Sequence, residues 1–163
     1  MIVEKVLAET DWAYMAGIVD GEGSIVIHKT RPQKKYQNKT HRYVVDVKIG
    51  MTDKRAMYWI KDNFGGCLYT SRKASKSSRE MFGWQIRANK ACDFLKRLSP
   101  YLKTKALQAE LAITFQSTLI RKTGWKGDGI QPEELAKRDA FYEMNKMLNH
   151  GYDPETEGGY YDR

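Results

Sequence analysis

The order of hydrophobic patterns is the feature that most constrains the fold of this chain. A compact helical pattern over residues 12–19 ends at residues 20–23, where two glycines interrupt it. Apolar and polar residues then alternate over residues 24–28 and again over residues 44–49, which predicts two half-buried strands. The polar stretch 29–41 between them predicts a hairpin with a long tip.

The same order of patterns occurs a second time. A helix is predicted over Lys54–Phe64, followed by strands over Cys67–Arg72 and Met81–Ala88 that are joined by a polar tip. Further helices are then expected over about residues 89–98, 103–120 and 132–148. Polar residues at the helix starts are expected to cap the first turn by accepting hydrogen bonds from backbone N–H groups. The expected caps are Thr10, Asp11, Asp53 and Asn89.

Two copies of an α-β-β unit place all four strands in one antiparallel sheet with helices on one face. We therefore predict an α+β fold of order αββαββα with a C-terminal helical extension. At 163 residues and 41% hydrophobic residues, the chain is long enough to bury one core. We expect a single domain over residues 8–148, with its core at about 8–120 and the extension at 121–148. The acidic, glycine-rich tail 149–163 is expected to be flexible.

The charge of the chain is unevenly distributed. The net charge is +8, and the last 13 residues hold four acids and one arginine, so the first 150 residues carry +11. Such a balance suits an anionic partner, of which nucleic acid is the commonest. A solvated basic surface is the plain alternative.

Two clusters of basic residues coincide with the predicted hairpins. Six bases and no acid lie between Glu22 and Asp46, and four bases and no acid lie between Asp62 and Glu80. A two-stranded ribbon fits the major groove of B-DNA, where basic edges neutralise phosphates and inner polar side chains read bases. We expect the uncovered sheet face and the hairpin tips to bind DNA through His28, Thr30, Arg31, Lys34, Lys35, Arg42, Lys48, Thr70, Arg72, Lys73, Gln85 and Arg87.

The two cysteines, Cys67 and Cys92, are too few for a structural zinc site. We interpret both as buried thiols in a reducing compartment. The sequence does not open on a signal-peptide pattern, and no apolar stretch approaches the length that a membrane span needs. We therefore expect an intracellular, cytoplasmic protein, associated with a nucleoid or an organelle depending on its host.

The segment from Met15 to Gly23 combines small residues with two acids. Gly17 and Gly21 are four residues apart, so they share a helix face, and small residues at this spacing let two helix backbones approach closely. Because the segment occurs once, the second helix would come from another subunit of a symmetric dimer. Two copies of Glu22 would then meet near the axis, where facing carboxylates suit a divalent cation. The expected interface residues are Ala16, Gly17, Asp20 and Gly21.

The nine residues Met15-Ala16-Gly17-Ile18-Val19-Asp20-Gly21-Glu22-Gly23 resemble the signature of the LAGLIDADG homing endonucleases. Every small, apolar and acidic position of the signature stays in register, and the element order over about residues 8–120 is also similar to the family. The resemblance is to the single-motif, homodimeric, intron-encoded type, with the archaeal rRNA-intron enzymes as one candidate group. It implies a saddle-shaped, four-stranded antiparallel sheet.

By this resemblance, Glu22 is the catalytic acid that binds metal, with Gly21 as a further metal ligand. Asp20 is mainly structural and holds the helix end and the partner chain. Lys105 lines the catalytic pocket as a water-ordering or charge-stabilising group, and Arg55 matches a second basic residue of that pocket. The implied ion is Mg²⁺, with Mn²⁺ or Ca²⁺ as substitutes.

The resemblance implies a site-specific endonuclease that hydrolyses both strands of a long pseudo-palindromic DNA site and leaves 3′ overhangs. Many phosphate contacts predict that binding depends steeply on salt. Two alternatives of the same fold stay open from the sequence: a maturase that helps its intron RNA to splice, and a non-cleaving DNA-binding regulator. A small protein-interaction domain is the generic alternative, and it leaves the basic hairpins and the acidic motif unexplained.

Overall fold

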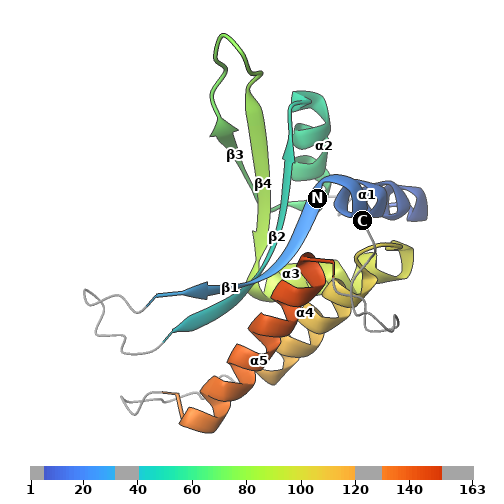
Figure 1. Ribbon diagram of the computed structural model, residues 1–163. Coiled ribbons are helices and arrows are strands. Elements are labelled where there is room, and N and C mark those ends of the chain that lie inside the picture. Colours follow the sequence, from blue (N-terminus) through green and yellow to red (C-terminus); the bar gives the residue numbers. More distant parts are fainter. Residues whose placement is uncertain (1–5, 32–40, 120–129, 152–163) are drawn as a thin grey trace, which may run out of the picture.

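The computed structural model describes residues 6–31, 41–119 and 130–151. Within them a four-stranded antiparallel sheet is covered on one side by helices, which confirms the predicted α+β class (Figure 1). The elements are α1 (Glu9–Glu22), β1 (Gly23–Thr30), β2 (Arg42–Met51), α2 (Lys54–Phe64), β3 (Cys67–Arg72), β4 (Met81–Arg87), α3 (Ala88–Leu98), the 3-10 helix η2 (Ser99–Tyr101), α4 (Ala106–Thr118) and α5 (Pro132–Asn149).

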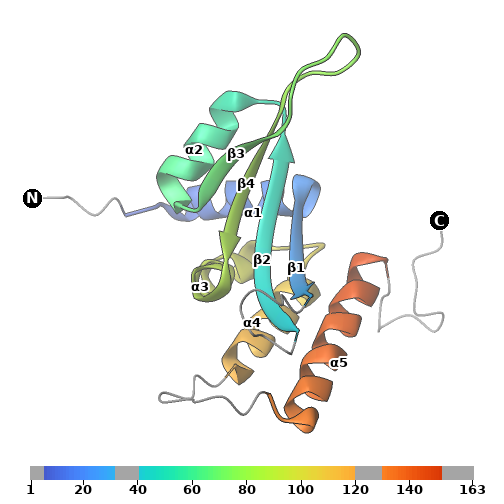
Figure 2. The ribbon, with the colours of Figure 1, turned by 90° about the vertical axis from the view of Figure 1, so that its left-hand side faces the viewer.

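The strand order is β1-β2-β4-β3, so β2 and β4 form the centre of the sheet and β1 and β3 its edges. Figure 2 looks onto the uncovered side of the sheet, and α1 lies behind the strands in this view. The hairpin of β1 and β2 and the hairpin of β3 and β4 diverge from one another, which gives the uncovered face a curved shape (Figure 1).

The first helix is longer than the sequence predicted. Ala8, rather than Thr10 or Asp11, is the N-cap residue, and the Asp11 carboxylate accepts a hydrogen bond from the Ala8 N–H at 3.0 Å. A carboxylate in the first turn is favoured by the helix dipole. The helix ends at Gly23, where an added Cβ would lie 2.7 Å from the Val19 carbonyl oxygen. Glycine fits this close approach, so the chain passes directly from α1 into β1.

Two further caps were predicted from the sequence, and one of them was wrong. Asp53 caps α2 as expected, since its carboxylate accepts hydrogen bonds from the N–H groups of Arg55 at 2.8 Å and Ala56 at 3.2 Å. Asn89 does not cap α3, which begins at Ala88 with a left-handed φ of 53°. The helix starts directly at the end of β4, so Asn89 already lies inside the first turn and its side-chain oxygen accepts from α4 instead.

The core lies between the sheet and the helices. Buried side chains alternate along the strands as predicted, and they include Ile25, Ile27, Val45, Val47, Ile49, Trp84 and Ile86. Burying one such side chain contributes roughly 1.5–3 kcal/mol. Cys92 is buried on α3, but Cys67 is exposed, which corrects the prediction of two buried thiols. Cys67 begins an edge strand and stands opposite Gln85 on the uncovered side, where no helix covers it. None of the helices in the described ranges is long and apolar enough to cross a membrane.

The last described helix closes the outer edge of β1. Asn145 on α5 is 1% exposed, and its side-chain oxygen accepts from the Ile27 N–H at 2.9 Å while its amide donates to the Ile25 carbonyl at 3.2 Å. Asn149 donates to the same carbonyl at 3.1 Å. Unpaired strand edges tend to pair with other chains, so these amides protect the edge of β1. Figure 2 shows α5 running beside this edge strand. The division into core, extension and tail stays a prediction, because residues 120–129 and 152–163 lie outside the described ranges.

Replacing Asn145 with alanine is expected to destabilise the protein by about 1–3 kcal/mol, because the buried Ile27 N–H would lose its acceptor. Urea unfolding followed by circular dichroism measures this loss. Met144→Ala is the control, since that neighbouring side chain is 42% exposed and its removal is expected to change stability by about 0.5 kcal/mol or less. Equal losses in the two variants would contradict the role of Asn145 at the strand edge.

Candidate active site and nucleic-acid interface

Asp20, near the end of α1, holds the turn that precedes α4. Its carboxylate accepts hydrogen bonds from the backbone N–H groups of Lys103 at 2.7 Å, Thr104 at 3.3 Å and Lys105 at 3.0 Å. Partial burial opposes ionisation, but these hydrogen bonds outweigh it and lower the pKa of Asp20 below its ordinary value of 3.8. The three donor residues were predicted to begin a helix, and they form this turn instead, so α4 begins at Ala106.

The side chain of Lys105 turns toward the same helix end. Its ammonium donates a hydrogen bond to the backbone carbonyl of Asp20, which is among the last carbonyls of α1 that have no partner within the helix. A cation at this end is also favoured by the helix dipole. Glu22 is exposed two residues further on, and within the described part of the chain no hydrogen bond or ion pair is recorded for its carboxylate. The structure therefore brings Glu22 and Lys105 to the same end of α1.

Arg55 lies on the first turn of α2 and is not joined to this pair by any contact recorded in the described ranges. Its side chain is 93% exposed, and its Nη2 atom lies 3.3 Å from the Asp53 carboxylate that caps the helix. Its role in a catalytic pocket stays a prediction.

One chain supplies only part of a metal shell. Among the described residues, no group of three or more His, Cys, Asp and Glu side chains is placed to hold a metal ion. The oxygens of Asp20 already accept three N–H donors, so Glu22 is the carboxylate left at this helix end, with the Gly21 carbonyl among the last carbonyls of α1. Hard oxygen donors of this kind fit Mg²⁺, which needs more ligands than these two residues provide.

The first helix has one buried side and one uncovered side. Ala16 is fully buried in the chain's own core, so its prediction as an interface residue is wrong. Ala13, Gly17 and Gly21 are exposed at intervals of four residues, and an added Cβ at either glycine would meet nothing within 4 Å. These three residues, called the small-residue side below, leave the backbone of α1 open to a close neighbour.

The uncovered sheet face carries most of the side chains predicted to bind DNA. Residues opposite one another on antiparallel strands share a face, so the register defines rows of neighbours on this side. The rows are Ser24, Lys48, Gln85 and Cys67; Val26, Asp46 and Arg87; His28 and Val44; and Thr30 and Arg42. Arg31 is exposed directly after β1, whereas Lys34 and Lys35 lie outside the described residues. DNA contact by these side chains stays a prediction.

The edge strand β3 departs from the predicted pattern at Thr70. This residue stands opposite Phe82, which shares its side with the buried Trp84, so Thr70 lies on the helix side and its predicted place on the uncovered face is wrong. A bulge between Thr70 and Arg72 then shifts the register, which returns Arg72 to the uncovered side. Lys73 follows as an exposed residue of the hairpin tip.

Tyr69 is a surface residue of the same face that the sequence did not single out. It is 43% exposed, and its ring covers Gly83, where an added Cβ would collide with the ring. The alternation with Leu68, which packs toward the core, is the signal that places Tyr69 on the uncovered side. Because β3 carries polar residues on both of its faces, the alternation of apolar and polar residues along this strand is hard to recognise in the sequence.

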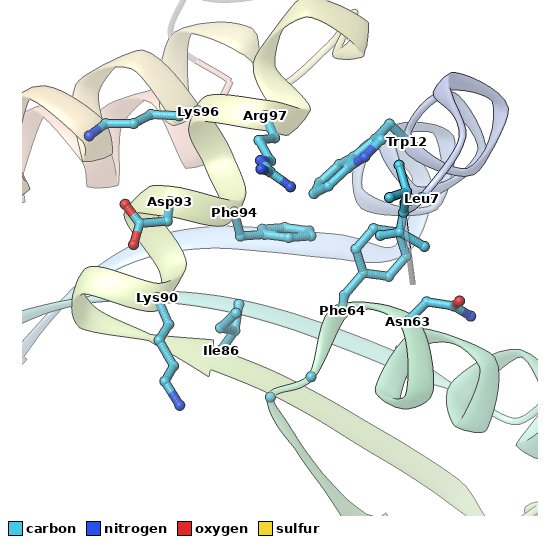
Figure 3. Close-up of a pocket in the computed structure, with 13 residues that line it drawn as sticks. Leu7, Trp12, Asn63, Phe64, Ile86, Lys90, Asp93, Phe94, Lys96 and Arg97 are labelled. Atoms are coloured by element: carbon cyan, nitrogen blue, oxygen red, sulfur yellow. The ribbon is translucent and has the colours of Figure 1, made fainter. Parts of the chain in front are cut away.

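A hollow of about 990 Å³ lies on the helix side of the sheet. Figure 3 shows Trp12 and Phe94 lining it, with Arg97 beside them, and the Arg97 guanidinium lies 5.9 Å from the centroid of the Trp12 ring. Its lining includes neither Glu22 nor Lys105. This hollow is therefore separate from the end of α1.

Comparison with known proteins assigns this arrangement to the DNA endonucleases. The model of the LAGLIDADG endonuclease family matches residues 15–119, which is more than half of the chain, and the chain belongs to this family. The predicted family and enzyme class are thereby confirmed. No curated protein matches the chain.

The structure is similar to those of several homing endonucleases. I-CvuI, solved in complex with its target in the presence of 2 mM Ca, has a TM-score of 0.69 and 21% identity over 91% of this chain and 87% of that chain. The archaeal intron-encoded I-Vdi141I, complexed with DNA, has a TM-score of 0.64 and 17% identity over 94% of this chain and 90% of that chain. I-TnaI has a TM-score of 0.57 and 18% identity over 85% of this chain and 95% of that chain. At these identities the likeness establishes the fold.

Replacing Asp20 with asparagine is expected to destabilise the protein in a pH-dependent way. Because the folded pKa is lowered, Asp20 stabilises the folded protein above its ordinary, unfolded-state pKa of 3.8, and this contribution is lost as pH falls through the folded value. The difference in unfolding free energy between the two proteins should be largest near neutral pH and shrink below about pH 4. Urea unfolding at several pH values measures it, with Asp62→Asn, exposed on α2, as the control. A difference independent of pH would contradict the assignment.

Proposed function

We propose that this chain is a homodimeric homing endonuclease that uses a divalent metal to cleave both strands of a long pseudo-palindromic DNA site, leaving 3′ overhangs. The observation that carries the proposal is the end of α1. Glu22 is exposed at the helix end to which the Lys105 ammonium donates a hydrogen bond. The small-residue side of this helix is uncovered, and the helix leads directly into the sheet.

The small-residue side supports a dimer built on α1. Two helices that pack through glycine and alanine approach more closely than helices with larger side chains. A symmetric pair would bring two copies of Glu22 toward one axis and would add the ligands that one chain lacks. One motif per chain and two chains per site also explain why the target would be roughly palindromic.

The uncovered face supports duplex DNA as the substrate. It carries cations in its rows and, within the described residues, at the tip of the β3–β4 hairpin, and its curved shape suits the wall of a groove (Figure 1). I-CvuI and I-Vdi141I, which share the fold, were solved in complex with DNA. I-CvuI was also solved with 2 mM Mg and DNA that was not cleaved.

The residues at the helix end divide the work of phosphodiester hydrolysis. Glu22 and the Gly21 carbonyl would hold a divalent ion through hard oxygen ligands, and that ion, when bound, would activate water and stabilise the leaving oxygen. Asp20 orients the turn that carries Lys105. The Lys105 ammonium, held at the helix end, stabilises negative charge that develops on the phosphate.

Glu22→Gln is expected to bind DNA as the natural protein does but to cut at least about 100-fold more slowly, because the amide is a poor ligand for a hard cation. Incubation with a long randomised DNA library, in Mg²⁺ or in EDTA, followed by sequencing of new ends measures cutting. Filter binding in EDTA measures DNA retention. Normal cutting by the variant would refute the role of Glu22. Retention of DNA without cutting by the natural protein would favour the non-cleaving and maturase alternatives.

Gly17→Leu is expected to give a stable monomer that no longer cuts both strands. Within one chain an added Cβ at Gly17 meets nothing within 4 Å, and leucine replaces a poor helix former, so folding should be unimpaired. Across the proposed interface it would hold the two helices apart. Sedimentation at micromolar concentration measures the oligomeric state. Glu110→Leu, which adds the same side chain at an exposed position of α4, is the control and should remain dimeric. A dimeric Gly17→Leu would place the interface elsewhere.

A further inference from the structure

A buried carboxylate lies at the centre of the uncovered sheet face. Asp46 on β2 is 1% exposed although no helix covers that side. Its Oδ1 atom accepts a hydrogen bond from the Arg87 Nε at 2.6 Å, and its Oδ2 atom lies 3.6 Å from the Lys48 Nζ. The side chains of Arg87 and Lys48 are 51% and 38% exposed, so the two cations cover the acid.

This ion pair restricts how Arg87 presents its guanidinium. The guanidinium is a rigid plane with five N–H donors, and the Nε donor is already committed to Asp46. The two terminal Nη groups are the donors that remain for a ligand. The backbone is fixed as well, because Arg87 is paired with Asp46 in the sheet and is followed at once by the left-handed Ala88 and helix α3.

Guanine matches the donors that remain. In the major groove, guanine presents two acceptors, N7 and O6, whereas adenine presents one acceptor and one donor on the same edge. A paired set of Nη donors binds both acceptors of guanine at once. Asp46 is too buried to accept from a cytosine itself, so its effect on DNA acts through Arg87.

We propose that Asp46 is a positioning residue that holds Arg87 to read one guanine in each half of the DNA site, an inference that rests on the proposed function. The row of Arg87 crosses β1 at Val26, four residues beyond Glu22. At about 3.3 Å per residue this is about 13 Å along the strand, or about four base pairs of DNA. The guanine should therefore lie in the inner part of each half-site, near the cut.

The test begins with the natural protein and the site that the randomised library selects. Each guanine of that site is replaced in turn by 7-deazaguanine, which removes N7 and keeps Watson–Crick pairing. One inner guanine per half-site should lose about 5- to 150-fold in affinity. Arg87→Lys, which keeps a cation beside Asp46 but loses the paired donors, should relax the preference for guanine at that same base pair by a similar factor.

Asp46→Asn separates positioning from simple structural support. It should relax the preference at the base pair that Arg87→Lys affects, although Asp46 is buried, and the double variant should add little to either change. A merely structural role would instead lower affinity for all sequences alike and leave base preference unchanged. Arg42→Lys is the matched control, since it makes the same substitution on the same face at an arginine without a carboxylate partner in the described ranges, and it should not alter that base pair.

The outcomes distinguish this inference from the proposed function. A natural protein that selects no DNA site overturns both. Site-specific binding in which Arg87→Lys weakens all sequences equally would identify Arg87 as a phosphate contact, and it would overturn the inference while the endonuclease stands. If Asp46→Asn fails to fold, Arg87→Lys and the 7-deazaguanine series still decide the guanine assignment.

Discussion

The hydrogen bonds that the Asp20 carboxylate accepts from residues 103–105 position the whole end of α1. They join segments more than 80 residues apart and tie the start of α4 to the end of the first helix. A carboxylate suits this place because it is an acceptor at both oxygens, whereas an amide would direct its own donors at one of the N–H groups. With Asp20 committed in this way, Glu22 is the acid that remains exposed, and Lys105 is drawn to the same helix end.

The same helix separates two kinds of packing. Met15, Ile18 and Val19 anchor α1 in the core of its own chain, and Gly17 and Gly21 keep the opposite side bare. A bare backbone gains little by facing water, since glycine in a helix costs about 1 kcal/mol relative to alanine. This cost has a physical reason if a second helix packs closely against the two glycines. The packing of one chain and the proposed packing of two therefore use different faces of one short motif.

Sequence patterns predicted what depends on near neighbours. Asp53 caps α2 because its acceptors reach N–H groups two and three residues away, and the strand alternation follows from the side-chain period of two. Sequence patterns failed where contacts between distant segments, or an irregularity in a strand, determine the local structure. The donors to Asp20 replaced a predicted helix start, the immediate turn from β4 into α3 displaced the cap expected at Asn89, and the bulge in β3 moved Thr70 to the helix side. The pairing of Asp46 with Arg87 depends on a register that no local pattern specifies.

The sheet has one surface that is available to bind a ligand. Helices cover one face, and the amides of Asn145 and Asn149 bond the free edge of β1. The uncovered face remains, and the cations at the tip of the β3–β4 hairpin suit phosphates, which every DNA sequence presents alike. Near the centre the charge is balanced differently, because Asp46 offsets part of the charge of Arg87 and Lys48. The offset charge lowers the general attraction for DNA, and the ion pair with Asp46 fixes the direction of the Arg87 donors. Together these two effects favour selectivity for one base over equal affinity for every base.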